Sequence, residues 1–195
     1  MALPSSPPPR AQHMPTDRFG AILAQTNSHR ARHGCGAYPF DDGSLVGVIA
    51  AAVKPTRILE LGCALGYTAN WMAYGAPGAI VDTVDMDPEH VRLAQENAAK
   101  FGHGDRIRVH TGRFDDVLDT LKRGYDLAFF DGSSPTTRYL DGFHRLLNPR
   151  GVLFSANLHF RDRETTAYRK ALFENGQWLS AHLSEDRETA LSIKR

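Results

Sequence analysis

Acidic and glycine residues lie together in one short stretch, RILELGCALGYTANWMA, which covers residues 57–73. Its apolar start predicts a buried strand, and Glu60, Gly62 and Gly66 come where that strand gives way to a helix. Glycines at such a turn let a ligand approach the backbone closely. A carboxylate at the same point tolerates a cationic ligand and repels an anionic one. The stretch therefore predicts a turn that holds a positively charged ligand.

The same turn disfavours a dinucleotide. The dinucleotide fingerprint G-x-G-x-x-G, started at Gly62, needs glycine at positions 64 and 67, where the chain has Ala64 and Tyr67. Glu60 would also repel a pyrophosphate. Because two of the three glycine positions fail, a nicotinamide dinucleotide is not the expected ligand.

Two further strand ends carry groups that could move a proton. Asp131 ends the apolar run YDLAFFDG, and Asn157 and His159 lie at the end of the run RGVLFSANLH. An imidazole titrates near neutral pH, so His159 suits proton removal, although a solvated loop histidine would look the same in the sequence. Asp131 also has two readings, because an acid at a strand end can orient a ligand or a loop. His29 and His33 could fold over a substrate from the segment before the first strand.

Strands and helices alternate from residue 41 onward. Helices are predicted over 44–53, 67–75, 88–102, 116–124, 136–147 and 162–174, and strands over 57–61, 79–85, 106–112, 125–132, 150–158, 177–184 and 189–195. Asp87 and Pro88 mark a helix start, and Gly102 and Gly124 mark helix ends. Five strand–helix units followed by an antiparallel hairpin predict an α/β fold with a seven-stranded, mostly parallel sheet covered on both faces. In such a sheet the ligand lies beyond the carboxyl ends of the strands.

Composition narrows the class of protein. The chain has 195 residues, 42% of them hydrophobic and 23% charged, which fits one ordinary globular domain. The net charge is +1, with 23 basic and 22 acidic residues, which disfavours nucleic acid as a partner. No apolar run approaches the roughly 20 residues that a membrane-spanning helix needs. Cys35 and Cys63 form neither a metal-type pair nor a disulfide framework, so a cytoplasmic location is expected.

The N-terminal stretch MALPSSPPPRAQHMP is rich in proline and serine and has no apolar core of a secretory signal. We therefore expect a disordered tail over residues 1–15 and a single domain over residues 16–195. Met14 could be the true start of the chain.

The motif ELGCALG followed by YT resembles the first motif of the class I S-adenosylmethionine-dependent methyltransferases, E-x-G-x-x-x-G. Its surroundings are most similar to the catechol and caffeoyl-coenzyme A O-methyltransferase group, over residues 42–195. The resemblance implies a Rossmann-like, doubly wound fold and S-adenosylmethionine as cofactor. It also implies methylation of a hydroxyl on a small-molecule acceptor, and it allows a homodimer. Ala64 departs from the glycine that is commonest at its position, although residues of alanine size occur there in the group.

The resemblance implies roles for the residues of the first motif. Gly62 and Gly66 would let the backbone approach the methionine part of the cofactor, with Ala64 in the same turn. Glu60 would face its ammonium side, directly or through water. Tyr67 and Thr68 would meet its carboxylate at the start of the helix, where free N–H groups favour an anion.

Residues after the next two strands would hold the rest of the cofactor. Asp85 would accept hydrogen bonds from both ribose hydroxyls, and Met86 would pack against the adenine. Gly112, Arg113 and Phe114 would form the far side of the adenine pocket. Taken singly, Asp85 could instead cap the next turn and Met86 could fill the core.

The catalytic metal of the group is not carried over. Relatives hold a divalent metal with an aspartate after the fourth strand and an Asp–Asn pair after the fifth, and a nearby lysine assists as base. Asp131 and Asn157 match two of these ligands, but the paired aspartate is Ala156 here and the lysine position is Ser134. Mg²⁺ is usually bound through carboxylates, so this set makes a poor site unless Asp162 or a substrate oxygen completes it.

Two other functions fit the same pattern. Basic residues in the C-terminal half could form a patch for RNA or could be the polar faces of two helices: Arg138, Arg145, Arg150, Arg161, Arg163, Arg169 and Lys170. The chain could therefore methylate RNA, or nitrogen rather than oxygen. It could also bind the cofactor without catalysis, since Ala156 and Ser134 remove two groups of the catalytic set.

Overall fold

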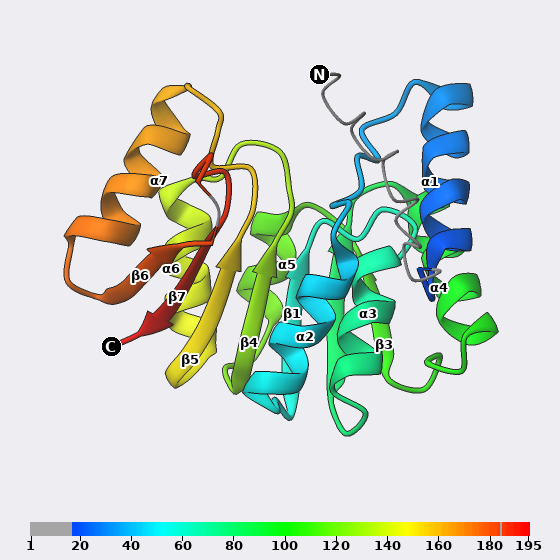
Figure 1. Cartoon of the computed structure of the whole chain (residues 1–195), viewed down its shortest axis with the longest axis horizontal. Coiled ribbons are helices and arrows are strands. Elements are labelled where there is room, and N and C mark those ends of the chain that lie inside the picture. Colours follow the sequence, from blue (N-terminus) through cyan, green and yellow to red (C-terminus); the bar gives the residue numbers. More distant parts are fainter. Residues whose placement is uncertain (1–16, 184) are drawn as a thin grey trace, which may run out of the picture.

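A seven-stranded sheet with the order β3-β2-β1-β4-β5-β7-β6 forms the centre of the computed structural model (Figure 1). The structure describes residues 17–183 and 185–195, so the tail expected over residues 1–15 lies outside the described residues. The first five strands pair in parallel, and β7 pairs antiparallel with β5 and β6. The strands are β1 (Arg57–Leu61), β2 (Ile80–Asp85), β3 (Ile107–Thr111), β4 (Tyr125–Phe130), β5 (Leu147–Ser155), β6 (Trp178–His182) and β7 (Ala190–Lys194). The predicted mostly parallel sheet with a C-terminal hairpin is confirmed.

Helices cover both faces of the sheet (Figure 1). One face carries α2 (Gly43–Val53), α3 (Tyr67–Gly75) and α4 (Pro88–Lys100), and the other carries α5 (Phe114–Thr120), α6 (Thr137–Leu146) and α7 (Arg163–Glu174). The alternation of side chains along β4 separates the two cores. Leu127 and Phe129 pack under α2 and α3, whereas Ala128 and Phe130 pack under α6. Each face therefore has its own buried apolar layer.

Helix α1 (Gly20–His33) was not predicted. Its buried residues are Ile22, Thr26 and His29, two of them polar, so the segment has no apolar stripe at helical spacing. Phe19, just before the helix, is 1% exposed and packs edge-on against Trp71. Figure 1 shows α1 beside α4, at the end of the sheet where β3 lies.

Two predicted elements are shifted in the structure. Helix α5 begins at Phe114 and ends at Thr120, where a helix over 116–124 was expected. Strand β5 begins at Leu147, where a strand over 150–158 was expected. Its pairing with β4 shifts in register between Tyr125 and Leu127, opposite an irregular part of β5 that contains Arg150 at a φ of +66°. The apolar pattern locates these elements, but the turns between them fix their ends.

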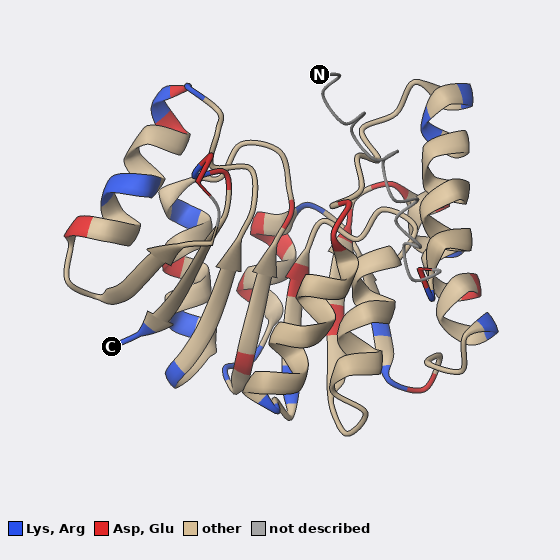
Figure 2. Cartoon of the chain, in the orientation of Figure 1, with Lys and Arg blue, Asp and Glu red and all other residues tan. Residues whose placement is uncertain are grey.

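Strand order reverses between β1 and β4, because β2 and β3 lie on one side of β1 and β5 lies beyond β4. The loops after these two strands must therefore diverge, which leaves a ligand site at their carboxyl ends. Acidic and basic positions are mixed over most of the ribbon, but α2 and β6 carry neither (Figure 2). No helix within residues 17–183 and 185–195 is long and apolar enough to cross a membrane.

Candidate active site

The glycine turn after β1 runs directly under the loop after β4. Gly62 has a φ of +108°, and a Cβ atom at this position would lie 2.4 Å from the carbonyl oxygen of Asp131. Only glycine fits this close approach of two backbones. Ala64 also has a positive φ, +43°, which costs an L-residue about 1 kcal/mol. The turn that the sequence singled out is therefore a strained segment at the switch point of the sheet.

Glu60 is fully buried at the end of β1. Its two carboxylate oxygens accept hydrogen bonds from the hydroxyl groups of Thr68 and Thr83, each over 2.5 Å. Burial raises the pKa of Glu60 to about 7, although the two hydroxyl groups act in the opposite direction. A cation bound beside this carboxylate would favour its ionised form.

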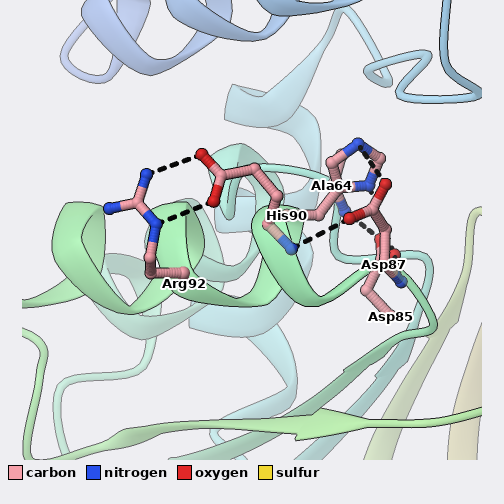
Figure 3. A network of polar contacts seen from close by, with 6 residues as sticks. Ala64, Asp85, Asp87, His90 and Arg92 are labelled. Atoms are coloured by element: carbon pink, nitrogen blue, oxygen red, sulfur yellow. Dashed lines mark hydrogen bonds and ion pairs between the residues drawn. The ribbon is translucent and has the colours of Figure 1, made fainter. Parts of the chain in front are cut away.

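Asp85 ends β2 and ties the next helix to the glycine turn (Figure 3). Its Oδ2 atom accepts a hydrogen bond from the Ala64 N–H over 2.9 Å, and its Oδ1 atom accepts one from the Asp87 N–H over 3.0 Å. Nδ1 of His90 lies 3.3 Å from Oδ1. A carboxylate offers about four acceptor positions, so Asp85 keeps capacity for a ribose hydroxyl. Its bond to Ala64 also stabilises the strained turn.

The residues expected around the adenine follow the ends of β2 and β3. Met86, beside Asp85, is 65% exposed, so its side chain is free to cover a ligand. Gly112 donates its backbone N–H to the carbonyl oxygen of Asp85, which places the start of α5 next to the end of β2. Phe114 is half-buried and packs edge-on against Phe130, whereas Arg113 is exposed.

Tyr67 and Thr68, expected to contact a ligand carboxylate, make other contacts with their side chains. The Tyr67 hydroxyl donates to Asp17 over 2.5 Å, and the Thr68 hydroxyl donates to Glu60. Tyr67 is 4% exposed within a cluster that includes Phe19 and Ile22. The first N–H groups of α3 have no partner within the helix, so the backbone at these residues still offers donors.

Asp131 and Asn157 meet at the carboxyl ends of β4 and β5. The Asn157 amide donates to Gly132 O over 2.6 Å and to Asp131 Oδ1 over 3.3 Å, from a backbone with a φ of +62°. Burial, reinforced by the charge of Glu60, raises the pKa of Asp131 well above its usual range. The backbone N–H of Phe40 also donates to this carboxylate. Asp131 is therefore oriented from two sides.

The donor set does not fit a hard divalent cation at Asp131. Ala156 is buried in the apolar core under α2 and α3. Asp162 accepts hydrogen bonds from the backbone and hydroxyl of Thr165 and from Ser134, so it caps α7 instead of facing Asp131. These bonds lower the pKa of Asp162 to about 2. Asp131 and Asn157 are thus left as one carboxylate and one amide.

The three histidines considered in the sequence lie in different surroundings. His159 is exposed and lies against Phe160, with ring centroids 4.4 Å apart. His29 is 5% exposed on α1, with its ring 5.2 Å from that of His90, and His33 is exposed at the end of the same helix. His29 therefore lies beside the Asp85 region, and a catalytic role for His159 stays a prediction.

A small recess lies over the glycine turn. It has about 10 Å³ of accessible volume, room for about one water molecule. Residues from four segments line it: Thr26, Tyr38, Pro39, Phe40, Gly62, Cys63, Ala64, Tyr67, Thr68 and Asp131. The segment with Tyr38 and Phe40 was not identified from the sequence, because it carries no motif. A larger recess of about 240 Å³, between α5 and α6, contains none of these residues.

Known proteins are similar to this chain in sequence. Residues 59–157 match the family model described as a methyltransferase domain. A catechol O-methyltransferase of Niastella koreensis is 34% identical over 73% of this chain and 67% of its own length. A catechol O-methyltransferase of Mycobacterium tuberculosis is 36% identical over 63% of this chain and 57% of its own length, so this chain spans less than two thirds of that relative.

The fold is also that of a solved enzyme. The O-methyltransferase from Bacillus cereus in complex with SAH superposes with a TM-score of 0.78 and 16% identity, over 95% of this chain and 94% of that one. The family match spans the glycine turn, Asp85, Asp131 and Asn157 together. The chain belongs to the class I S-adenosylmethionine-dependent methyltransferases, in the catechol and caffeoyl-coenzyme A O-methyltransferase group.

Proposed function

We propose that this protein transfers a methyl group from S-adenosylmethionine to a hydroxyl of a small-molecule acceptor. The observation that supports this most directly is the placement of Asp131. Its oriented carboxylate lines the same recess as Gly62, Ala64 and Thr68 of the glycine turn. A proton acceptor and the cofactor turn thus share one site.

The residues around the turn fit the cofactor. The buried Glu60 would balance the positive charge of its ammonium group, and Asp85 would hold its ribose. The first N–H groups of α3, at Tyr67 and Thr68, would receive its carboxylate. Met86 and Phe114 would enclose its adenine. When bound, S-adenosylmethionine supplies an electrophilic methyl group on a sulfonium.

Asp131 is our candidate for the general base. A methyl acceptor must present a free lone pair, so its hydroxyl proton has to be removed. The raised pKa of Asp131 makes it a stronger base than an ordinary aspartate, and Asn157 holds its orientation. His159 is exposed, and it is not among the residues that line the recess. Proton removal through the Asp131 carboxylate requires no divalent cation.

Turnover of cofactor labelled in the methyl group tests the function. The protein would be incubated with pooled catechols and other phenols, with nitrogen-containing metabolites and with transfer RNA. We expect label in the phenol fraction, and Asp131→Asn should lower that rate far more than His159→Ala does. Label in transfer RNA or on nitrogen would contradict the proposal. Cofactor binding without transfer to any pool would indicate a binding protein.

The structure gives little support to RNA as the acceptor. Arg138 pairs with Asp115 over 2.9 Å, and Arg145 lies 3.6 Å from Asp119. Arg169 donates to the carbonyl oxygen of Leu158 over 3.0 Å. Three of the seven basic side chains are therefore engaged within the chain, whereas Arg150, Arg161, Arg163 and Lys170 are exposed. A cytoplasmic location and a homodimer belong to the same proposal, and size-exclusion chromatography with light scattering tests the dimer.

A further inference from the structure

Two histidines and a cysteine from α1, the segment just after it and α4 lie together near Asp85. They are His29 on α1, Cys35 just after that helix, and His90 in the first turn of α4. One ligand atom of each lies within 4.8 Å of those of the other two. We propose that His29, Cys35 and His90 form a binding site for a zinc ion, distinct from the Asp131 site.

Burial supports ligation rather than solvation of these groups. His29 and His90 are each 5% exposed, and Cys35 is partly buried against the cluster around Phe19. Within the described residues, no hydrogen bond joins the His29 imidazole or the Cys35 thiol to another group. Nε2 of His90 is buried without a hydrogen-bond partner. A buried polar nitrogen without a partner is costly, and a metal ion would satisfy it.

The orientation of His90 matches that of a metal ligand. Its Nδ1 atom lies 3.3 Å from Asp85 Oδ1, so the tautomer that donates to Asp85 leaves the lone pair of Nε2 free (Figure 3). Metal-binding histidines commonly donate their other N–H to a carboxylate in this way. Asp87 Oδ2 lies 3.6 Å from the same Nε2, near enough to serve as a fourth ligand after a small movement.

One thiol and two imidazoles favour zinc over magnesium as the bound ion. Thiolate and imidazole are the ligands that Zn²⁺ prefers, and hard cations such as Mg²⁺ prefer oxygen. In a tetrahedral zinc site with bonds of 2.0–2.3 Å, ligand atoms lie about 3.3–3.8 Å apart, so closure needs shifts of about 1 Å. The imidazoles must be neutral to bind.

The left-handed turn at Gly34 directs the chain back toward α1, so that Cys35 lies near His29. Gly34, with a φ of +62°, ends α1 in the left-handed conformation and donates its N–H to Arg30 O over 2.8 Å. Asn97 on α4 donates to Gln25 on α1 over 2.9 Å, which fixes the two helices side by side. A bound zinc ion would thus join α1 to α4 and to Asp85.

Titration of chelator-treated, tag-free protein with Co²⁺ as a spectroscopic probe tests the site. We expect one Co²⁺ per chain, with a thiolate charge-transfer band and displacement by Zn²⁺. Cys35→Ser should abolish the band. His29→Ala and His90→Ala should each weaken binding at least ~10-fold, since loss of an outer-shell partner alone costs about 10–100-fold. Cys63→Ala and His182→Gln, which change the same residue types elsewhere, should bind as the unaltered protein does.

A second measurement needs no substitution. Zn²⁺ should protect Cys35 from alkylation in the unaltered chain, with the slow reaction of the buried Cys63 as the internal reference. Absence of Co²⁺ binding, equal binding by Cys35→Ser, or alkylation of Cys35 at the same rate with and without Zn²⁺ would overturn the proposal. None of these outcomes depends on methyl transfer, so the site is tested separately from the proposed activity.

Discussion

The Thr68 hydroxyl at the start of α3 donates a hydrogen bond to the buried Glu60 at the end of β1, over 2.5 Å. Together with the bond from Thr83, it is one of two hydroxyl contacts to a carboxylate that has no exposed surface. The pair holds a titrating acid under the glycine turn, where the cofactor's positive charge is expected.

Glu60→Gln should therefore weaken cofactor binding without destabilising the fold. A hydrogen bond to a charged group contributes about 1.5–3 kcal/mol, so affinity for S-adenosylhomocysteine should fall roughly 10–150-fold at pH 8. In the unaltered protein, affinity should rise with pH as Glu60 ionises around pH 7, and in the variant it should stay flat. Calorimetry at several pH values measures both, and a pH-dependent variant would contradict this role.

The raised pKa of Glu60 also makes the free energy of unfolding depend on pH. Its pKa is raised from about 4.5 to about 7, so the folded protein holds the proton more tightly than the unfolded chain. The free energy of unfolding should then fall as pH rises from about 4.5 to 7, by up to about 3 kcal/mol from this group. Denaturant titrations should show Glu60→Gln to be more stable than the unaltered protein at pH 8.

Asp85→Ala should weaken cofactor binding by roughly 1–3 kcal/mol, the scale for losing hydrogen bonds to a charged group. It should also leave the Ala64 N–H without its acceptor, so some of the loss reflects the turn itself. Calorimetry with S-adenosylhomocysteine measures the effect. Glu96→Gln, an exposed acid paired with Arg92 on α4, is the matched control and should bind normally. Tight binding of NAD with no response to the sulfonium cofactor would contradict the assigned ligand.

Methyl transfer should not require Mg²⁺ or Ca²⁺. Asp131 and Asn157 give only one carboxylate, and Asp162 is engaged at the start of α7. Protein treated with chelator should show the same rate before and after addition of Mg²⁺ or Ca²⁺. Restoration by these ions would show that an unidentified ligand completes a site at Asp131. Restoration by Zn²⁺ alone would point to His29, Cys35 and His90 instead.

A chain that begins at Met14 should melt within a few degrees of the full chain, because the first 13 residues have no apolar residues at regular spacing. A chain that begins at Gly36 is the contrast. It loses Phe19 and Ile22, each 1% exposed, and should melt roughly 10 °C lower or more. Scanning calorimetry compares them, and a large loss in the first truncation would show that the tail packs.

The sequence predicted the parts of the fold that depend on local pattern. Apolar runs located the strands, and the glycines after the first of them marked the turn where a ligand was expected. The structure adds that Gly62 also admits the backbone of Asp131. Asp131 and Asn157 were each placed at a strand end, and the structure shows that their side chains meet. Helix α1 was missed because its buried face includes Thr26 and His29, which do not look apolar.

Contacts between distant segments could not be predicted. Cys35 and His90 are separated by much of the first half of the chain, and no spacing rule brings them together. Tyr38 and Phe40 line the recess because Phe40 packs edge-on against Phe129 and Phe154, which only the folded structure shows. A sequence motif shows which residues are close along the chain. Cys35 and His90, like Phe40 and Phe154, become neighbours only when the chain folds.

The close approach of Gly62 to Asp131 restricts how this enzyme could diversify. Any side chain at position 62 would displace the loop that carries Asp131. A substitution of Gly62 would therefore disturb the glycine turn and the candidate base together. Tyr38, between α1 and α2, borders the same recess and is 69% exposed, whereas Phe40 packs on the core and its backbone N–H contacts Asp131. Libraries aimed at new acceptors should therefore vary Tyr38 and Pro39 and leave Phe40 and the glycine turn unchanged.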